Sequence, residues 1–301
     1  MNDIINEIKN NKIGKVLENI YMKNYTTYKI GGKVRLMVYP KDVDSLIKLM
    51  TIIQRENIDY KIVGEGSNII FSDKDYNGII IKLDNLNNLK INDTIITVGA
   101  GYNLMRLAIK LSREGLAGLD FATGIPGSVG GAVYMNAGAY KSDMGYIVSA
   151  IKVLTPDLEV KIMYNNDLEF KYRTSFLQKN PGYICLEATI VLRKGNKDLI
   201  KEIVEDRKQR RLMSQPLEYP SAGSVFRNPE GDYAGRLIEE CGLKGKELGG
   251  AMVSQKHANF IINYNNASAS DVKDLITLVK DEVYRKFGIE LKVKQEFVNW
   301  E

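Results

Sequence analysis

The sequence predicts an α+β protein, with a β-rich body over about residues 30–195 and an α+β cap over about residues 205–301. Two observations carry this prediction. From Tyr60 onward, short runs rich in Ile and Val end at glycines, a pattern typical of sheet strands joined by tight turns. Beyond Lys197 the chain changes to longer runs with helical spacing of apolar residues, separated by a loop rich in Pro, Gly and Ser over residues 215–231.

Two helices are predicted in the first half of the chain. The first 20 residues indicate a short helix, because the isoleucines from Ile4 to Ile13 fall on one helical face. Apolar residues recur at helical spacing again over about residues 103–114, and Gly115 ends that run. Strands are predicted at residues 61–63, 69–71, 78–81, 94–98, 147–154 and 183–192.

The second half predicts three helices. A charged helix spans about residues 197–212, and its apolar residues are expected to face a core. The last helix has Ser270 as its N-cap and ends at Gly288. The apolar residues of the charged helix are Leu199, Ile200, Ile203 and Val204. The other predicted elements are a helix at residues 233–241, strands near Met252 and at residues 260–262, and a terminal strand from Glu290.

Composition and charge restrict the possible classes of function. Apolar residues make up 44% and charged residues 26% of the 301 residues, a balance that excludes a disordered or collagen-like chain. The net charge of +5 is small for a nucleic-acid binder, so a phosphate-bearing small molecule is the favoured partner. No apolar run reaches the roughly 18 residues of a membrane span. We therefore expect neither a nucleic-acid nor a membrane partner. The sequence leaves the oligomeric state open, and a monomer is favoured.

The N-terminus and the cysteines predict the compartment. The first residues lack the basic and apolar regions of a secretory signal. Cys185 and Cys241 lie far apart, and neither belongs to a CxxC pair, so a zinc cage or a disulfide framework is unsupported. We expect a cytoplasmic protein without a bound metal, in which both cysteines are packing residues.

Two glycine-rich segments, residues 64–68 and 124–132, are candidate anion-binding loops. Glycine lets backbone N–H groups approach an anion closely, although either segment alone is also consistent with a structural turn. A Rossmann fingerprint fails because Ile69 stands where its third glycine belongs. A Walker A loop fails because Glu247 follows Gly245-Lys246. If a dinucleotide binds, the sequence predicts that it binds through loops between strands and not at a helix N-terminus.

Other polar residues suggest chemistry. Arg173 lies among aromatic residues, where a guanidinium can hold a carboxylate with two hydrogen bonds, although a structural ion pair is equally consistent. Ser224 lies among small residues, and no GxSxG elbow accompanies it. Since His257 is the only histidine, a Ser-His-Asp hydrolase is disfavoured, whereas a serine that donates a proton needs no histidine. The basic run at residues 207–211 fits a solvated helix face or a diphosphate site.

Five motifs in a fixed order identify a resemblance. They are Gly64-Glu65-Gly66-Ser67-Asn68, Gly124-Ile125-Pro126-Gly127-Ser128-Val129-Gly130-Gly131, Asn136-Ala137-Gly138-Ala139-Tyr140, Tyr172-Arg173-Thr174-Ser175-Phe176 and Ser221-Ala222-Gly223-Ser224-Val225-Phe226-Arg227-Asn228-Pro229. Over about residues 24–287 the chain resembles the UDP-N-acetylenolpyruvoylglucosamine reductase (UDP-N-acetylmuramate dehydrogenase) family, in its shorter, type II form.

The resemblance implies an FAD-binding domain of the vanillyl-alcohol-oxidase type, followed by an α+β substrate-binding cap. In the implied division, residues 1–25 are a helical segment, residues 26–195 bind FAD in two subdomains that meet near residues 82 and 83, and residues 205–301 bind substrate. Non-covalent FAD, NADPH as hydride donor and a UDP-sugar substrate are implied. The implied FAD-binding residues are Gly64, Glu65, Gly66, Ser67, Asn68, Gly124, Ile125, Pro126, Gly127, Ser128, Gly130, Gly131 and Ala132.

The resemblance also implies catalytic and substrate-binding residues. Arg173 would stabilise the negative charge that builds on the substrate, and Ser224 would donate a proton to the substrate carbon C2. Tyr172 and Asn228 would bind substrate. Two other functions stay open: another flavin-dependent oxidase of the same FAD fold, and a non-catalytic flavin-binding paralogue. Retention of both Arg173 and Ser224 argues against the non-catalytic paralogue.

A third catalytic residue, a glutamate near the C-terminus, raises a problem of register. The family has a leucine, two variable residues and then the glutamate. Counting from Leu291 without a gap puts Lys294 in that place, whereas counting from Val293 puts Glu296 there. In a continuous strand these two side chains point to the same face, about 6.5–7 Å apart, so a small bulge could exchange them. We expect Glu296 to be the catalytic carboxylate.

Overall fold

The computed structural model describes residues 2–300, which form two compact units. The first unit contains the segment that ends at Glu18, together with Leu36–Gly64 and Asn77–Gln209. The second contains Asn19–Arg35, Glu65–Tyr76 and the segment that begins at Arg210. These units are discontinuous, unlike the linear domains predicted at residues 26–195 and 205–301. The cause is packing, because Tyr28 and Ile70 are buried in the same core as the C-terminal helices.

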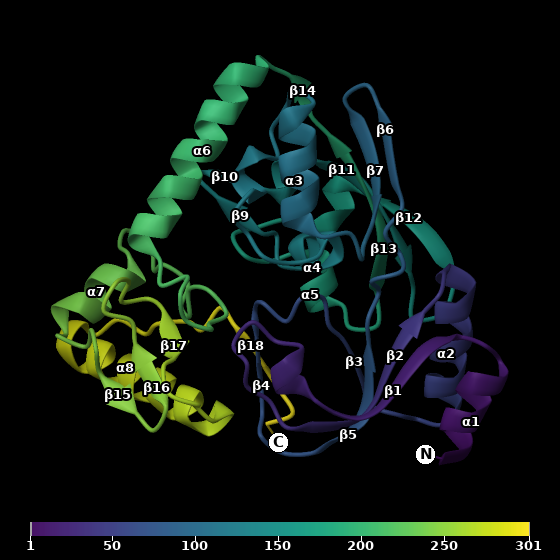
Figure 1. The fold of residues 1–301 in the computed structure, drawn as a ribbon, viewed down its shortest axis with the longest axis horizontal. Helices are drawn as coiled ribbons and strands as arrows, with labels where there is room; N and C mark the ends of the chain where they lie inside the picture. Colours follow the sequence, from purple (N-terminus) through teal and green to yellow (C-terminus); the bar gives the residue numbers. More distant parts are fainter. Residues whose placement is uncertain (1, 301) are drawn as a thin grey trace. The chain divides into compact units, whose positions relative to one another are not determined.

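A five-stranded antiparallel sheet forms the centre of the first unit (Figure 1). Its strand order is β12-β11-β13-β7-β6, and the residues of β7 alternate between buried and more exposed positions before Gly99 ends the strand. The strands predicted at residues 94–98, 147–154 and 183–192 are confirmed. The sheet consists of β6 (Leu89–Asn92), β7 (Ile95–Gly99), β11 (Val148–Leu154), β12 (Val160–Tyr164) and β13 (Ile184–Val191).

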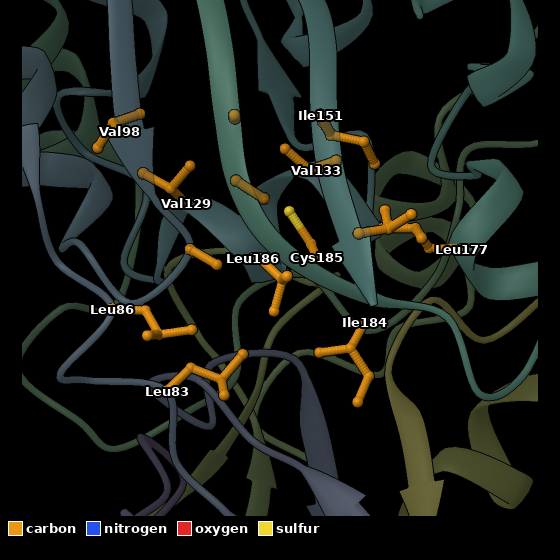
Figure 2. Close-up of a cluster of buried hydrophobic side chains, with 14 of the residues drawn as sticks. Leu83, Leu86, Val98, Val129, Val133, Ile151, Leu177, Ile184, Cys185 and Leu186 are labelled. Atoms are coloured by element: carbon orange, nitrogen blue, oxygen red, sulfur yellow. The ribbon is translucent and has the colours of Figure 1, made fainter. Parts of the chain in front are cut away.

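Short helices pack on this sheet and bury its apolar face. Helix α3 (Leu104–Arg113) confirms the helix predicted at residues 103–114, and Asn103 is its N-cap. Helix α4 (Val129–Tyr134) packs against β13 and β7. In Figure 2, Val129 and Val133 of α4 lie beside Leu186 and the sulfur of Cys185 in one apolar cluster. This packing fixes α4, and therefore the glycine-rich segment that leads into it.

A second sheet of the order β1-β2-β5-β3 was only partly predicted. Strands β3 (Tyr60–Ile62) and β5 (Tyr76–Ile81) match the predicted runs and pair in parallel. Residues 2–21 form α1 (Asn2–Asn10) followed by β1 (Gly14–Tyr21), so the prediction of a helix over the first 20 residues is correct only for α1. The unpredicted elements are β2 (Lys33–Pro40) and α2 (Val43–Arg55).

The second unit contains α7 (Ala234–Glu240) and α8 (Ala269–Phe287) with a three-stranded antiparallel sheet. The N-cap of α8 is Ser268 and not Ser270, because Ser268 forms a capping box with Asp271. Gly288 ends α8 in the left-handed conformation, as predicted. The sheet consists of β15 (Glu247–Leu248), β16 (Ala251–Val253) and β17 (Ile261–Asn263).

The terminal strand is shorter than predicted. Strand β18 (Glu296–Val298) begins six residues after Glu290 and pairs in parallel with β4 (Ile69–Phe71). Before β18 the chain follows a different partner, since Val293 bridges Phe226. The chain therefore changes pairing partner where a continuous strand was expected.

Helix α6 (Lys197–Ser214) has a narrower buried face than predicted. Ile200 is buried, but Leu199 and Ile203 are 59% and 43% exposed. Neighbouring residues in a helix point about 100° apart, so one of each adjacent apolar pair faces away from the protein. Among the residues that the structure describes, no helix is long and apolar enough to cross a membrane. The remaining short elements are β8 (Leu116–Ala117), β9 (Gly138–Ala139), β10 (Ser142–Asp143), β14 (Arg193–Lys194) and α5 (Phe176–Lys179), with 3-10 turns at Met22–Asn24, Asp120–Ala122, Met144–Tyr146 and Asn165–Leu168.

Candidate functional site

The first glycine motif begins at the carboxyl end of a parallel strand pair. Ile62 of β3 is paired with Ile81 of β5, so Gly64 and Lys82 both follow the ends of these strands. The ammonium group of Lys82 donates a hydrogen bond to the Gly64 carbonyl oxygen. Ligands of open α/β sheets bind beyond the carboxyl ends of parallel strands, so this edge is a candidate binding site.

The second glycine motif lies directly against the first. A Cβ on Gly64 would stand 2.5 Å from the Ser128 Oγ, and a Cβ on Gly130 would stand 2.9 Å from the Cβ of Ala100. The amide of Gly130 donates to the Ala100 carbonyl oxygen at 2.8 Å. Glycine is required here because the segments approach more closely than side chains permit.

The expectation that both motifs are loops between strands is only partly correct. Ser128 is the N-cap of α4, and its Oγ accepts a hydrogen bond from the Gly131 amide at 3.2 Å. The second motif is therefore the start of a six-residue helix. The first motif leads into β4 and not into a helix, which confirms that this is not a Rossmann fingerprint.

The donor set in the first unit fits the pyrophosphate of a dinucleotide such as FAD. Because Gly64 has no Cβ, the two glycine motifs meet closely beside the carboxyl ends of β3 and β5. Lys82 is a buried residue with only 6% of its surface exposed, and its ammonium group brings a positive charge next to Gly64. Backbone donors and a cation are the groups that hold a phosphate.

Arg173 is held at the opposite end of α4 from Ser128. Its guanidinium donates to the Asn136 carbonyl oxygen at 3.3 Å and to that of Gly138. Ser175, two residues later, donates to the carbonyl oxygen of Tyr134, the last residue of α4. The sequence motifs around Ser128 and Arg173 are thus connected through one short helix of the first unit.

The backbone of Arg173 has a φ of +56°, which is uncommon for a residue with a side chain. Its guanidinium carbon lies 5.1 Å from the centre of the Tyr172 ring, and Tyr172 is exposed. The buried side chain of Asn136 supports the neighbouring turn, since it donates to the Lys171 carbonyl oxygen and accepts from the Gly145 amide, both at 2.9 Å. The two hydrogen bonds of Arg173 to the carbonyl oxygens of Asn136 and Gly138 therefore fix the orientation of the guanidinium plane.

In the second unit, Ser224 immediately precedes a segment held by Asn259. The carboxamide of Asn259 accepts from the Phe226 amide at 2.9 Å and donates to the Phe226 carbonyl oxygen at 3.0 Å. The Val225 amide donates to the Asn259 carbonyl oxygen at 2.8 Å. These three bonds fix the backbone next to Ser224.

His257 does not form the catalytic pair of a hydrolase with Ser224. Its Nδ1 accepts a hydrogen bond from the Asn259 amide at 3.2 Å, and its ring centre lies 4.8 Å from that of Phe260. Within residues 2–300, no hydrogen bond is formed between His257 and Ser224. Burial lowers the pKa of His257 below its ordinary value.

The C-terminal segment contacts two of the sequence motifs. The Lys294 amide donates to the Val225 carbonyl oxygen at 2.7 Å, while its own carbonyl oxygen accepts from the Asn68 side chain at 3.3 Å. The Glu296 amide donates to the Asn68 carbonyl oxygen at 2.9 Å. The chain bends at Gln295 and β18 begins at Glu296, so Lys294 and Glu296 do not belong to the one continuous strand on which the expectation was based.

The basic run and Asn228 have local partners. Arg207 forms an ion pair with Asp120, and its guanidinium carbon lies 4.6 Å from the centre of the Tyr140 ring. Lys208 lies 3.4 Å from Glu205, one turn earlier in α6. The side chain of Asn228 is exposed and accepts from the Ala234 amide at the start of α7 at 3.2 Å. Arg207 is therefore a structural residue of the first unit.

Sequence reasoning missed Lys82, Asn259 and Gln295. Gln295 is buried and donates to the carbonyl oxygens of Ala222 and Gly223 at 3.1 and 3.2 Å. These residues belong to none of the glycine-containing motifs. Only Lys82 carried a signal, because a lysine directly follows the apolar run of β5.

The cysteines and the candidate metal ligands form no second functional site over the described residues. Burial raises the pKa of the Cys185 thiol to about 12 and also raises that of Cys241, in agreement with packing roles. In the described part of the chain, no group of three or more His, Cys, Asp or Glu side chains is arranged to hold a metal ion.

Two family profiles match the sequence. The profile of the UDP-N-acetylenolpyruvoylglucosamine reductase C-terminal domain matches residues 215–298, and an FAD binding domain profile matches residues 34–162. The chain therefore carries an FAD-binding domain, which confirms FAD as the cofactor.

Full-length relatives carry the same name. The reductases of Anoxybacillus flavithermus and Bacillus subtilis are 46% and 43% identical to this chain, over 99% of it and 99% of their own lengths. The crystal structure of the Thermus caldophilus UDP-N-acetylenolpyruvylglucosamine reductase superposes with a TM-score of 0.83 at 33% identity, over 94% of this chain and 98% of that one. The expected fold, with an FAD-binding domain of the vanillyl-alcohol-oxidase type and an α+β C-terminal domain, is confirmed.

Proposed function

The chain belongs to the UDP-N-acetylenolpyruvoylglucosamine reductase family, and on this basis we propose that it reduces UDP-N-acetylenolpyruvoylglucosamine to UDP-N-acetylmuramate with NADPH as hydride donor. One structural observation supports this proposal in addition to membership of the family. Ser128, which lies against Gly64 in the candidate FAD-binding cradle, is the N-cap of α4. The other end of α4 contacts the segment of Arg173, the proposed carboxylate-binding residue, so α4 positions both groups. This combination suits a flavoenzyme whose substrate is an acid.

The proposed reaction saturates the vinyl group of the enolpyruvyl ether. Bound FAD supplies the hydride transfer, from NADPH to the substrate carbon C3. Arg173 binds the substrate carboxylate and stabilises the negative charge that spreads into it from C2. The fixed plane of the guanidinium permits this without reorganisation, which is the source of such electrostatic stabilisation.

Ser224 donates the proton that completes the product at C2. One hydride and one proton are added across the double bond, and NADP⁺ is released. A serine hydroxyl is a weak acid, so it requires accurate placement beside the carbon that it protonates. The three hydrogen bonds between Asn259 and the Val225–Phe226 backbone support that placement. We propose Glu296 as the carboxylate that completes the catalytic set, and Tyr172 and Asn228 as substrate-orienting residues.

The proposed product defines a cellular role. UDP-N-acetylmuramate is a precursor of peptidoglycan, so the enzyme would act in cell-wall biogenesis and through it in cell shape and division. Cytoplasmic location is part of the same proposal, and the free state of Cys185 and Cys241 supports it. We propose that the enzyme is a monomer.

A flavin spectrum followed through both halves of the reaction tests the proposed function. The purified protein should be yellow, and acid should release the flavin because the bond is not covalent. NADPH should bleach the flavin under anaerobic conditions, and the enolpyruvyl substrate should then restore the colour. Recovery only with oxygen would indicate an oxidase, and a flavin that NADPH does not bleach would indicate a non-catalytic paralogue. Either result would overturn the proposal.

A further inference from the structure

Lys82 is a buried cation at the candidate cofactor cradle. It is 6% exposed and follows β5, whose apolar residues Ile79, Ile80 and Ile81 are fully buried. The next residue, Leu83, lies beside Leu86 in a cluster of buried apolar side chains (Figure 2). The backbone of Lys82 is thus held in the core while its ammonium reaches the Gly64 carbonyl oxygen.

The charge of Lys82 is weakly compensated by the protein itself. The carboxylate that pairs with it belongs to Asp84, whose side chain is 52% exposed and whose Oδ1 lies 3.4 Å away. Burying an ammonium group is costly unless close partners replace its water. An exposed carboxylate at that distance replaces only part of this hydration. A doubly charged pyrophosphate in the adjacent cradle would supply the missing compensation.

We propose that Lys82 is a cofactor-binding residue, whose ammonium neutralises the pyrophosphate of FAD beside Gly64. The inference rests on the assignment of FAD to the cradle of Gly64 and Ser128. It assigns the affinity for the phosphate part of the cofactor to a residue outside both glycine motifs. The flavin ring is not involved, so Lys82 should contribute nothing to the binding of a flavin that lacks phosphate.

The proposal has a distinctive consequence for stability. Methionine has nearly the length of lysine without its charge, so Lys82→Met removes the desolvation cost of the buried ammonium. The apo protein should therefore unfold at the same or a higher temperature than the unmodified chain. The stabilisation on adding FAD should shrink, since it follows the affinity for the ligand. A purely structural lysine would behave in the opposite way, because its loss would destabilise the apo protein.

The experiment measures ligand binding to apo protein by fluorescence titration, without any assay of turnover. FAD and riboflavin are titrated into the unmodified chain and into Lys82→Met, Lys82→Arg and Lys110→Met. In Lys82→Met the Kd for FAD should rise at least about tenfold, while the Kd for riboflavin stays within twofold. Lys82→Arg retains the charge and should bind FAD with nearly normal affinity. Lys110 lies on α3 and pairs with Glu114, so Lys110→Met controls for the change in net charge.

Each other outcome counts against the proposal. Equal losses for FAD and riboflavin, an apo Lys82→Met protein that melts at a lower temperature or cannot fold, or an FAD affinity within threefold of normal would each overturn it. A loss in Lys82→Arg as large as in Lys82→Met would also overturn it, because the charge would then be irrelevant. If the unmodified chain binds no FAD, it is the proposed function that fails, and this control separates the two failures.

Discussion

The ammonium nitrogen of Lys294 lies 3.7 Å from the point that a Cβ on Gly223 would occupy, one residue before Ser224. Hydrogen bonds fix this approach, because the Lys294 backbone is bonded to Val225 on one side and to Asn68 on the other. Counting from Leu291 without a gap puts Lys294 in the position of the family's glutamate, so in that alignment the side chain next to the Ser224 turn is positively charged. The proposal that Glu296 supplies a catalytic carboxylate has to be tested against this arrangement.

Turnover of three variants decides between the two registers. If Glu296 is catalytic, Glu296→Gln should lower kcat by about 10²-fold or more, while Lys294→Ala should change it by less than tenfold. Glutamine keeps the size of the side chain and removes its negative charge. A near-normal Glu296→Gln, together with a marked gain in Lys294→Glu, would show that the catalytic carboxylate of the family belongs at position 294.

Ser224→Ala should separate the two halves of the reaction. NADPH needs no proton from the protein, so the rate of flavin bleaching should stay within about twofold of normal. Recovery of the colour by the enolpyruvyl substrate should slow by about 10²–10⁴-fold, the usual contribution of general acid catalysis. Rapid mixing with absorbance at the flavin band measures both rates. Equal loss in both halves would assign Ser224 a binding or folding role.

Arg173→Lys should be as damaging as a neutral substitution. An ammonium group cannot reproduce the planar fork with which, in the proposed reaction, Arg173 binds the substrate carboxylate. It also cannot bond simultaneously to the carbonyl oxygens of Asn136 and Gly138, which hold the guanidinium in place. We expect kcat for the second half-reaction to fall by about 10²–10³-fold. Turnover near that of the unmodified enzyme would remove Arg173 from the catalytic set.

Two matched glycine-to-alanine changes test the cradle. Gly130 lies in α4 and Gly235 in α7, so alanine gains similar helix propensity at both positions. A Cβ at position 235 meets its nearest neighbour at an ordinary 3.5 Å, so Gly235→Ala should stabilise the protein by about 0.5–1 kcal/mol. A Cβ at position 130 meets Ala100 at 2.9 Å, so Gly130→Ala should push the start of α4, which includes Ser128 as its N-cap, away from Ala100.

The measurement is the ratio of flavin to protein after purification, together with the melting temperature. Gly130→Ala should lose most of its FAD, and replacement by valine should give colourless protein. A normal flavin content in both variants would mean that the close packing of Gly130 against Ala100 is not needed for binding.

Elements whose signal is local were predictable from the sequence. The helical spacing of Val272, Leu275, Ile276, Val279 and Val283 predicts one buried face of α8, and all five side chains are buried. In α6 the same reasoning overestimated the buried face, because spacing does not tell how much surface another element covers. Local pattern therefore predicts the type of an element better than its burial.

Contacts between distant parts of the chain could not be predicted in this way. Asn68 and Lys294 are 226 residues apart, yet the side chain of one bonds to the backbone of the other. Motifs with a local backbone signature, such as the glycine segments, indicated part of the site. Lys82 and Asn259 were missed because their roles depend on partners that only folding brings near: Gly64 and Phe226.

The single histidine allows a test of the second unit by pH. Burial of His257 lowers its pKa below 6.5, and the bond from the Asn259 amide to Nδ1 also requires that nitrogen to be unprotonated. The charged groups that influence it have opposite effects, since Lys244 lowers its pKa and Glu239 raises it. The folded state therefore binds a proton less readily than the unfolded state. The stabilisation by neutral His257 should be complete above about pH 6.5 and should be lost as the pH falls below that value.

His257→Gln should flatten the dependence of unfolding free energy on pH between about 5 and 7, because glutamine does not titrate. Denaturant unfolding at half-unit pH steps measures this dependence, and NMR of the one imidazole gives its pKa directly. Lys244→Met is the companion variant, since removing that positive charge should raise the His257 pKa without disturbing the buried ring. An imidazole that titrates at or above 6.5 in the folded protein would contradict the assignment of His257 to a buried, neutral role.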